Sequence, residues 1–310
     1  MNFSEIIIII FGLIFFEIIA SIDNAIINAD VLLTMSKKAR RWFLNYGIII
    51  AVFGVRGLLP LLIIYFSNPS IGVVNAFTAT FSSNESVRHI IENSKPVLLA
   101  GGGIYLVFLF FHWLFMETKE YAFFLESHIH KKYSFWFYSV SSIILLIFVW
   151  LTIHINSFIV LGILVGSTAF FITVGFKNNA EEKEKELKRG RLSDISKIFY
   201  LEVIDSTFSI DGILGAFAFT ISVPLILIGN GIGAFVVRYI TIHGAETIKK
   251  YKYLKNGAMY SVAVLGIIML GESLGHSSPS WLPPITTFVV VGIFFWLSIK
   301  ELVVEKVITN

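Results

Sequence analysis

The chain has 310 residues, of which 56% are hydrophobic and 15% are charged, and its mean hydropathy is +0.80. This composition predicts a polytopic membrane protein and excludes a large soluble domain. The net charge is only +3, and no nucleic-acid partner is expected. Because the chain contains no Cys, it has no disulfide, no thiolate metal site and no thiol redox centre.

Apolar runs of about 20 residues predict an all-α bundle of about nine transmembrane helices in a lipid bilayer. We expect these helices at residues 5–33, 42–66, 96–116, 134–153, 157–176, 197–221, 223–243, 257–275 and 283–303. The first run has no basic residues before it and carries acids at its middle, so we interpret it as mature structure rather than as a signal peptide. The charged segment 178–190 is interpreted as a solvated linker.

The positions of the basic residues predict how the helices are oriented. With the N-terminus outside, 20 of the 24 Lys and Arg residues fall in cytoplasmic segments, among them the run 177–197. Cytoplasmic loops of membrane proteins carry such an excess of positive charge. We therefore expect a multi-pass protein of the plasma (inner) membrane, with its C-terminus in the cytoplasm.

Two acidic segments of similar pattern lie in helices predicted to cross in opposite directions. Glu17 precedes Asp23 by six residues, and Asp205 precedes Asp211 by the same spacing, with Ser-Ile before the second acid in both. The helices that follow both carry an arginine, Arg56 in one and Arg238 in the other. An inverted repeat of helices 1 to 3 and 6 to 8 accounts for this pattern, and such repeats place a substrate site near the bilayer midplane.

The expected organisation is a single membrane domain, residues 1–310. Within it we expect the following parts: the first repeat at 1–116, connecting helices and the charged cytoplasmic linker at 117–196, the second repeat at 197–276, and the last helix with a cytoplasmic tail at 277–310.

The acids are predicted to face one another, because a charged residue at the bilayer centre costs about 2.5–3.5 kcal/mol on insertion scales. Six residues turn a straight helix by about 600°, so the two acids of each segment point roughly 120° apart. Convergence on one ion therefore requires a local break in each helix, which Asn24 and Gly212 are suited to supply.

Several carboxylates cannot all stay ionised in a dry, empty pocket, because two of them about 5 Å apart repel by roughly 3 kcal/mol. Either protons or a bound cation must neutralise them. A set of oxygen ligands favours a hard divalent cation, with Mn²⁺ as our first choice and Ca²⁺ or Mg²⁺ as alternatives. The predicted ligands are Glu17, Asp23, Asn24, Glu202, Asp205 and Asp211.

Arg56 and Arg238 allow two interpretations. In one, they form structural ion pairs with the acids; in the other, they are tethered counter-ions that neutralise the carboxylates when the metal leaves. Glu272, in the eighth predicted helix, is a candidate proton relay on the transport path, with a hydrogen-bonded packing role as the alternative.

These motifs resemble those of the TerC family of integral membrane proteins, in the lysine-exporter superfamily. The residues that carry the resemblance are Glu17-x5-Asp23-Asn24, Glu202-x2-Asp205-x5-Asp211, Arg56 and Arg238. Gly212-Ile213-Leu214-Gly215 stands where a typical member has Ser-Ile-Pro-Ala, so the chain looks like a divergent branch. The resemblance implies efflux of manganese or a related divalent cation, and a link to tellurite resistance and metal stress. In some relatives it implies metal supply to enzymes outside the membrane.

Three functions are therefore open, and none of them is enzymatic. The first is a secondary exporter of a divalent cation coupled to protons, because metal binding displaces protons from carboxylates. The second is a non-transporting scaffold or metallation factor with membrane-protein partners. The third is export of a cationic amino acid, for which the pocket holds more negative charge than the substrate needs.

Overall fold

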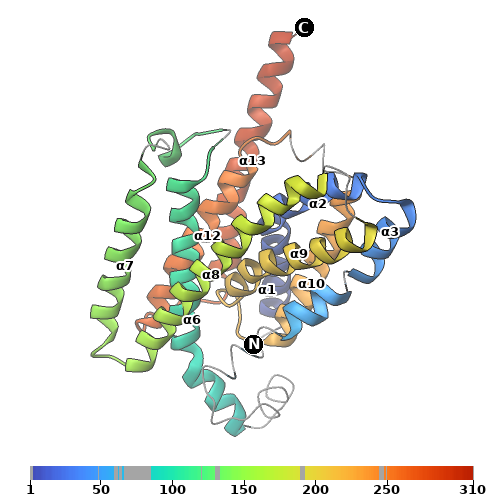
Figure 1. Ribbon diagram of the computed structural model, residues 1–310. Coiled ribbons are helices and arrows are strands. Elements are labelled where there is room, and N and C mark those ends of the chain that lie inside the picture. Colours follow the sequence, from blue (N-terminus) through green and yellow to red (C-terminus); the bar gives the residue numbers. More distant parts are fainter. Residues whose placement is uncertain are drawn as a thin grey trace.

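The computed structural model describes residues 3–47, 49–58, 62, 65, 85–119, 121–129, 133–188, 193–243, 248 and 250–309, and is all-helical without strands over these ranges (Figure 1). For residues 23, 24, 26, 27, 30, 51, 53, 55, 85–92, 180–188, 208, 242, 243 and 304–309, only the backbone is described. The helices are α1 (Phe3–Ala20), α2 (Ile22–Leu33), α3 (Lys37–Trp42), η1 (Phe43–Gly47), η2 (Ile50–Gly57), α6 (Glu85–Met116), η4 (Leu125–Ser127), α7 (Trp136–Thr152), α8 (Ser157–Lys188), α9 (Asp194–Ala216), α10 (Val223–His243), α12 (Leu254–Ser273) and α13 (Leu282–Thr309).

The described helices confirm the prediction of a polytopic membrane bundle. Six of them, α1, α6, α8, α10, α12 and α13, are long and apolar enough to cross a membrane. The apolar helix α7 is shorter, with 17 residues. The helix α9 has sufficient length, but charged residues interrupt its apolar face. Of the predicted second span, 42–66, seven residues lie outside the described residues, and η1 and η2 make up most of the rest.

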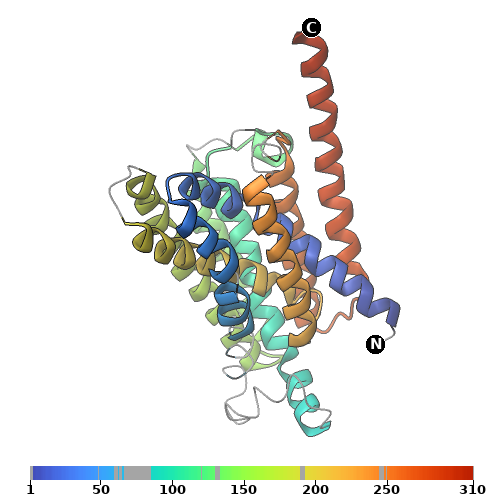
Figure 2. The same cartoon turned by 90° about the vertical axis from the view of Figure 1, so that its right-hand side faces the viewer.

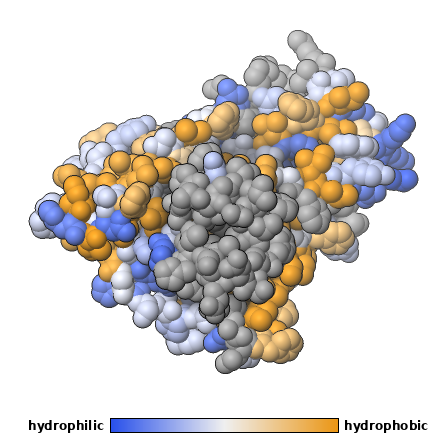
Figure 3. All heavy atoms as spheres, turned by 90° about the horizontal axis from the view of Figure 1, so that it is seen from below, coloured by the Kyte–Doolittle hydropathy of each residue, from blue (hydrophilic) through white to orange (hydrophobic). Residues whose placement is uncertain are grey.

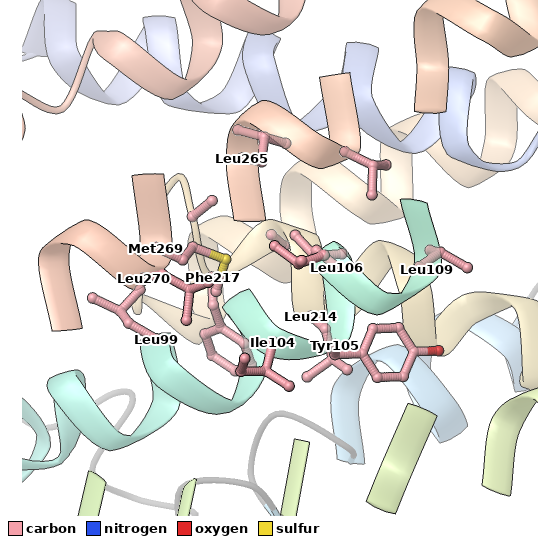
Figure 4. Packing of buried hydrophobic residues seen from close by; sticks show 14 of the residues in the cluster. Leu99, Ile104, Tyr105, Leu106, Leu109, Leu214, Phe217, Leu265, Met269 and Leu270 are labelled. Atoms are coloured by element: carbon pink, nitrogen blue, oxygen red, sulfur yellow. The ribbon is translucent and has the colours of Figure 1, made fainter. Parts of the chain in front are cut away.

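The helix α6 is at the centre of the bundle. In its most apolar stretch 83% of the residues are buried, against 33% to 56% in the other five candidate spans. A helix that is hydrophobic all round belongs in the interior of a bundle. Figure 4 shows how Ile104 and Leu106 of α6 pack with Leu214 of α9 and Leu265 of α12.

Glycines let α8 approach α6 closely. A Cβ atom at Gly101 of α6 would lie 2.8 Å from the carbonyl oxygen of Gly162 in α8. On the other side of α6, a Cβ atom at Gly103 would lie 2.8 Å from Leu270 of α12. The run Gly101-Gly102-Gly103 therefore packs α6 between two helices, as glycines at helix contacts in membranes do.

The segment predicted as a solvated linker is helical. The helix α8 continues without interruption from Ser157 to Lys188, so it contains residues 178–188 of the predicted linker. The helix predicted at 157–176 is therefore longer than expected, because Glu, Lys and Ala are strong helix formers and extend an existing helix at little cost. Lys177, which the sequence assigned to a cytoplasmic run, consequently lies within α8.

The predicted first helix is divided at Ser21 into α1 and α2. The backbone bonds from Ser21 N to the Glu17 oxygen, 3.1 Å, and from Ala25 N to the Ser21 oxygen, 2.9 Å, continue across this point. The irregularity at Ser21 therefore does not interrupt the backbone hydrogen bonds. It lies three residues before Asn24, where a break was expected. The helix α9 is continuous through Gly212. The expectation that Asn24 and Gly212 break the two helices was wrong.

The ends of α2 and α9 show that the acidic segments run in opposite directions. Lys197, near the start of α9, donates to the carbonyl oxygen of Thr34 at 3.0 Å and to its hydroxyl at 2.9 Å. Thr34 is the C-terminal cap of α2. The division of the chain into two inverted repeats stays a prediction.

The surface of the bundle is largely apolar. Large hydrophobic side chains such as Leu146 and Trp150 of α7, Phe176 of α8 and Trp296 of α13 are exposed. Figure 3 shows orange, apolar side chains over much of the visible face. The C-terminal end of α13 extends beyond the other helices in both side views (Figure 2). A surface of this kind is stable when lipid covers it.

A buried glutamate anchors the connection between α6 and α7. Glu126 of η4 accepts hydrogen bonds from Asn256 Nδ2 and the Tyr260 hydroxyl of α12, both at 2.5 Å. Burial raises the pKa of Glu126. The two hydrogen bonds and the backbone N–H of Phe123 lower the pKa by more than burial raises it, so the pKa lies below its ordinary value.

Candidate functional site

Glu17 is fully enclosed and forms an ion pair with Arg56. The Arg56 Nη2 atom lies 2.6 Å from Glu17 Oε1, and the Ser21 hydroxyl donates to the same oxygen at 2.9 Å. Ser21 thus helps to orient this carboxylate at the kink between α1 and α2. Arg56 comes from η2, a π-helical turn, and such turns are frequent at functional sites.

Arg238 of α10 binds the acids of α9. Its Nη2 atom lies 3.2 Å from Asp205 Oδ2 and 3.8 Å from Glu202 Oε1. Its Nη1 atom donates to the Phe43 carbonyl at 2.5 Å, and the guanidinium lies 4.1 Å from the centre of the Phe43 ring. Arg238 is therefore held from three sides.

The residues Glu17, Arg56, Glu202, Asp205 and Arg238 form what we call the arginine cluster. Asp205 and Glu202 are close enough to Arg56 to interact with it electrostatically, so the two ion pairs belong to one network. A small cavity, about large enough for one water molecule, lies in this cluster. Its lining includes Ser21, Asn28, Arg56, Asp205, Arg238 and Thr241.

Several polar atoms of this region have no hydrogen-bond partner among the described residues. They are Glu17 Oε2, Asn28 Oδ1, Arg56 Nε and Nη1, and both carboxylate oxygens of Glu202. A buried polar group without a partner costs about 1–3 kcal/mol, and more when it is charged. Native structures retain such groups where water, an ion or a function accounts for them.

Asp211 lies in a second group, which we call the lysine cluster. The Tyr105 hydroxyl of α6 donates to Asp211 Oδ1 at 2.5 Å, and Lys177 of α8 forms an ion pair with Oδ2. Because α9 is a continuous helix, Asp205 and Asp211 point in different directions, as the rotation of about 120° between them requires. Asp205 faces α10, whereas Asp211 faces α6 and α8.

Glycines bring the two clusters next to each other. A Cβ atom at Gly212, the residue after Asp211, would lie 2.6 Å from Glu17 Oε2. A Cβ atom at Gly233 of α10 would lie 2.6 Å from the Cβ of Glu17. Glu17 therefore fits between α9 and α10 only because both helices have a glycine there. Gly47 leaves similar room for Glu202 Oε1.

The structure distributes the predicted ligands unevenly. Glu17, Glu202 and Asp205 gather in the arginine cluster, Asp211 is turned to the lysine cluster, and the side chains of Asp23 and Asn24 are outside the described residues. Among the side chains that the structure describes, no group of three or more His, Asp or Glu is arranged to hold a metal ion. The six-ligand site stays a prediction.

Glu272 lies elsewhere. Its carboxylate is 3.0 Å from Lys95 Nζ and accepts a hydrogen bond from Ser278. These partners belong to α6 and to the segment after α12, so Glu272 forms an ion pair of its own and does not join either cluster. Its predicted role on the transport path stays untested.

Sequence reasoning missed Lys177, Tyr105 and Asn28 as members of this region. Lys177 was counted with the cytoplasmic charges, and Tyr105 is one of many aromatic residues in an apolar helix. Asn28 lies five residues after Asp23. The presence of a polar amide in a transmembrane segment is the signal by which it could have been found.

Comparisons with known proteins support a membrane family. A family model described as "Protein of unknown function (DUF475)" matches residues 22–304. The "Uncharacterized membrane protein YceF" of Bacillus subtilis (strain 168) is 27% identical over 112 residues, which are 35% of this chain and 44% of YceF. The match thus spans less than half of the length of that relative. No solved structure matches the chain.

Proposed function

Since this chain belongs to the family described as "Protein of unknown function (DUF475)" and folds as a bundle of apolar helices, we propose that it is a secondary transporter that exports a divalent cation, with Mn²⁺ as the preferred substrate. One observation carries this proposal. The two clusters together hold four carboxylates, each beside a basic side chain that comes from another helix: Glu17 beside Arg56, Glu202 and Asp205 beside Arg238, and Asp211 beside Lys177.

Stability alone does not explain these charges. Replacing a buried ion pair by apolar residues of similar volume is often neutral or stabilising, because taking two charges out of water costs about as much as their attraction returns. Ionisable residues inside a membrane usually mark the path of an ion. A network of four acids is therefore better explained by a cation substrate than by folding.

The charge balance favours a divalent ion. The sequence predicts five acids for the site, Asp23 among them, and the structure pairs the other four with three basic groups, Arg56, Lys177 and Arg238. When all these groups are ionised, two negative charges are left over, which is the charge of one divalent cation. The unpartnered oxygens of Glu17 and Glu202 are available as ligands, and carboxylate oxygens are the ligands that Mn²⁺ prefers.

The basic side chains act as tethered counter-ions in this proposal. They neutralise part of the carboxylate charge when no ion is bound. Protons serve as the coupling ion, because metal binding displaces protons from carboxylates. Export and the choice of Mn²⁺ follow the resemblance of the acidic motifs to the TerC family, and the membrane is the plasma membrane with the N-terminus outside.

Transport in vesicles tests the proposal. Purified protein is reconstituted with a Mn²⁺-sensitive dye, and the flux is measured with and without a proton gradient. We expect the wild type to move Mn²⁺, and Asp23→Asn and Asp211→Asn to abolish the flux. The matched control is Glu117→Gln, which removes an acid paired with Lys255 at 2.9 Å outside the apolar spans. Undiminished flux in both Asp variants rejects the site.

A second outcome supports the scaffold function. If the wild type shows no flux but co-purifies with a defined membrane protein, and Asp211→Asn abolishes that association, then the buried acids serve assembly or metallation instead of transport. A third substrate class, a cationic amino acid, is tested in the same vesicles with radiolabelled lysine.

A further inference from the structure

We propose that Lys177 is a tethered competitor of the transported cation: its ammonium group occupies Asp211 when no ion is bound, and the ion reaches this carboxylate only after Lys177 has left it. The inference rests on the proposed function, because it names how that same site is controlled. It concerns the lysine cluster, Tyr105, Lys177 and Asp211.

The position of Lys177 shows that the contact is specific. The apolar part of α8 extends from Ser157 to Asn179, so Lys177 lies at its end. A lysine near the end of a transmembrane helix ordinarily extends its flexible chain toward the water at the interface. Lys177 instead turns toward α9, where its side chain is only 14% exposed and pairs with Asp211.

The lysine pair is more open than the glutamate pair of the arginine cluster. The side chains of Lys177 and Asp211 are 14% and 13% exposed, whereas those of Arg56 and Glu17 are 3% and 0% exposed. An ion approaching from outside the bundle therefore reaches Asp211 more easily than Glu17. The Arg238 side chain and the acids beside it, 10% and 11% exposed, lie between these two pairs in exposure but much nearer to the lysine pair.

Lys177 can leave Asp211 without disturbing the carboxylate. An ammonium group is a single charge on a flexible four-carbon chain, whereas a guanidinium makes several directed bonds at once. Arg238 shows the second behaviour, since it also binds the Phe43 carbonyl and ring. The hydroxyl of Tyr105, a fully buried residue of α6, lies 2.5 Å from Asp211 Oδ1 and keeps the carboxylate in place.

The freed carboxylate lies next to the rest of the site. Gly212 follows Asp211 and faces Glu17 Oε2, an oxygen without a partner among the described residues. An ion that replaces Lys177 therefore binds at the residue next to the part of the α9 backbone that contacts Glu17. Departure of Lys177 removes one positive charge and a divalent ion brings two, so the two negative charges left over in the balance above are reduced to one, which lowers the cost of unpaired charge in a membrane.

Competition of this kind has a measurable size. When a binding-competent state is only fractionally populated, the apparent Kd is the intrinsic Kd divided by that fraction. If Lys177 occupies Asp211 about nine-tenths of the time, its removal tightens binding about tenfold. We therefore expect Lys177→Met to bind Mn²⁺ about tenfold more tightly than the wild type, and Lys177→Arg, which keeps the charge, to bind no more tightly.

Isothermal titration of the full-length, detergent-purified protein with MnCl₂ tests this expectation. The matched control is Lys255→Met, which removes a more exposed lysine, paired with Glu117 and not with either cluster, and leaves the Kd unchanged. If Lys177→Met binds Mn²⁺ as the wild type does, or more weakly, then Lys177 is a structural partner and the inference is overturned.

A measurement on the wild type makes the test independent of how the variants fold. Acetic anhydride modifies free lysine amines, and mass spectrometry follows each lysine separately. We expect MnCl₂ to increase the modification rate of Lys177 and not that of Lys255; an unchanged rate at Lys177 overturns the inference. If the wild type neither binds nor transports Mn²⁺, the proposed function itself fails, whereas binding and transport with an unchanged Lys177 reject only the competitor role.

Discussion

Replacement of Arg56 by Met separates a structural ion pair from a tethered counter-ion. Arg56 is 2% exposed and its Nη2 atom lies 2.6 Å from Glu17 Oε1, so Arg56→Met leaves the Glu17 carboxylate buried without its cation. Removing one partner of a buried pair costs about 3–5 kcal/mol. With 310 residues and an unfolding entropy of about 2.1 cal/mol/K per residue, this loss lowers the melting midpoint by about 5–8 °C.

The counter-ion role predicts a rescue that a structural pair does not. If Mn²⁺ takes the place of the missing charge, then Mn²⁺ at about 100 times its Kd adds about 2.7 kcal/mol of stability, which recovers most of the loss. The Arg56→Met/Glu17→Gln variant no longer has the Glu17 charge that Arg56 compensates, so we expect it to melt above Arg56→Met and to respond less to Mn²⁺ than Arg56→Met does.

The assay is thermal unfolding in detergent, followed by Trp fluorescence, with NaCl at matched ionic strength as the control. Trp113 is buried in the bundle and reports on its packing. If Arg56→Met melts at the same temperature as the wild type, then the variant contains no uncompensated Glu17 carboxylate, and the expected loss of about 5–8 °C is refuted. A lowered midpoint that Mn²⁺ does not raise shows that the pair is structural, and the counter-ion reasoning is then wrong.

Three further predictions use the same melting assay. Gly212→Ala places a Cβ 2.6 Å from Glu17 Oε2 and is expected to destabilise by about 1–3 kcal/mol, whereas Gly271→Ala, with open space around it, is neutral or stabilising; equal effects contradict the close fit. Lys197→Met removes the bonds to Thr34 and is expected to cost about 1–3 kcal/mol; an unchanged midpoint rules out the capping role. The pKa of Glu126 is below its ordinary value, so the ionised carboxylate stabilises the fold at a pH above the pKa of the unfolded state, and this stabilisation is lost as the pH falls through the pKa of the folded state. We expect Glu126→Gln to weaken the dependence of the melting midpoint on acid pH; the same pH profile in the variant and the wild type contradicts this role of Glu126.

The sequence predicted the helices well where apolar runs were long. The predicted span 223–243 coincides with α10, and 283–303 lies within α13. The length of the apolar run is almost sufficient to predict where these two helices begin and end. It does not decide where charged residues extend a helix, so a helix was expected to end at residue 176, whereas α8 continues to Lys188.

The candidate site was only partly predictable. The spacing of Asp205 and Asp211 correctly indicates that they point in different directions on a straight helix, and the pairing of acids with Arg56 and Arg238 was one of the two interpretations offered. The partner of Asp211 could not be read from the sequence, because a contact between Lys177 and Asp211 depends on how α8 crosses α9. Tertiary packing, which periodicity does not encode, decides that crossing.

The enclosure of α6 has a consequence for biogenesis. Residues 85–116 leave the ribosome before α8, α9 and α12 exist, so this helix must first enter the bilayer with its whole circumference against acyl chains. The sides of α6 that carry Gly101 and Gly103 then stay in contact with lipid until α8 and α12 are inserted and displace it. Synthesis of the second half of the chain is therefore required before the first half reaches its final environment.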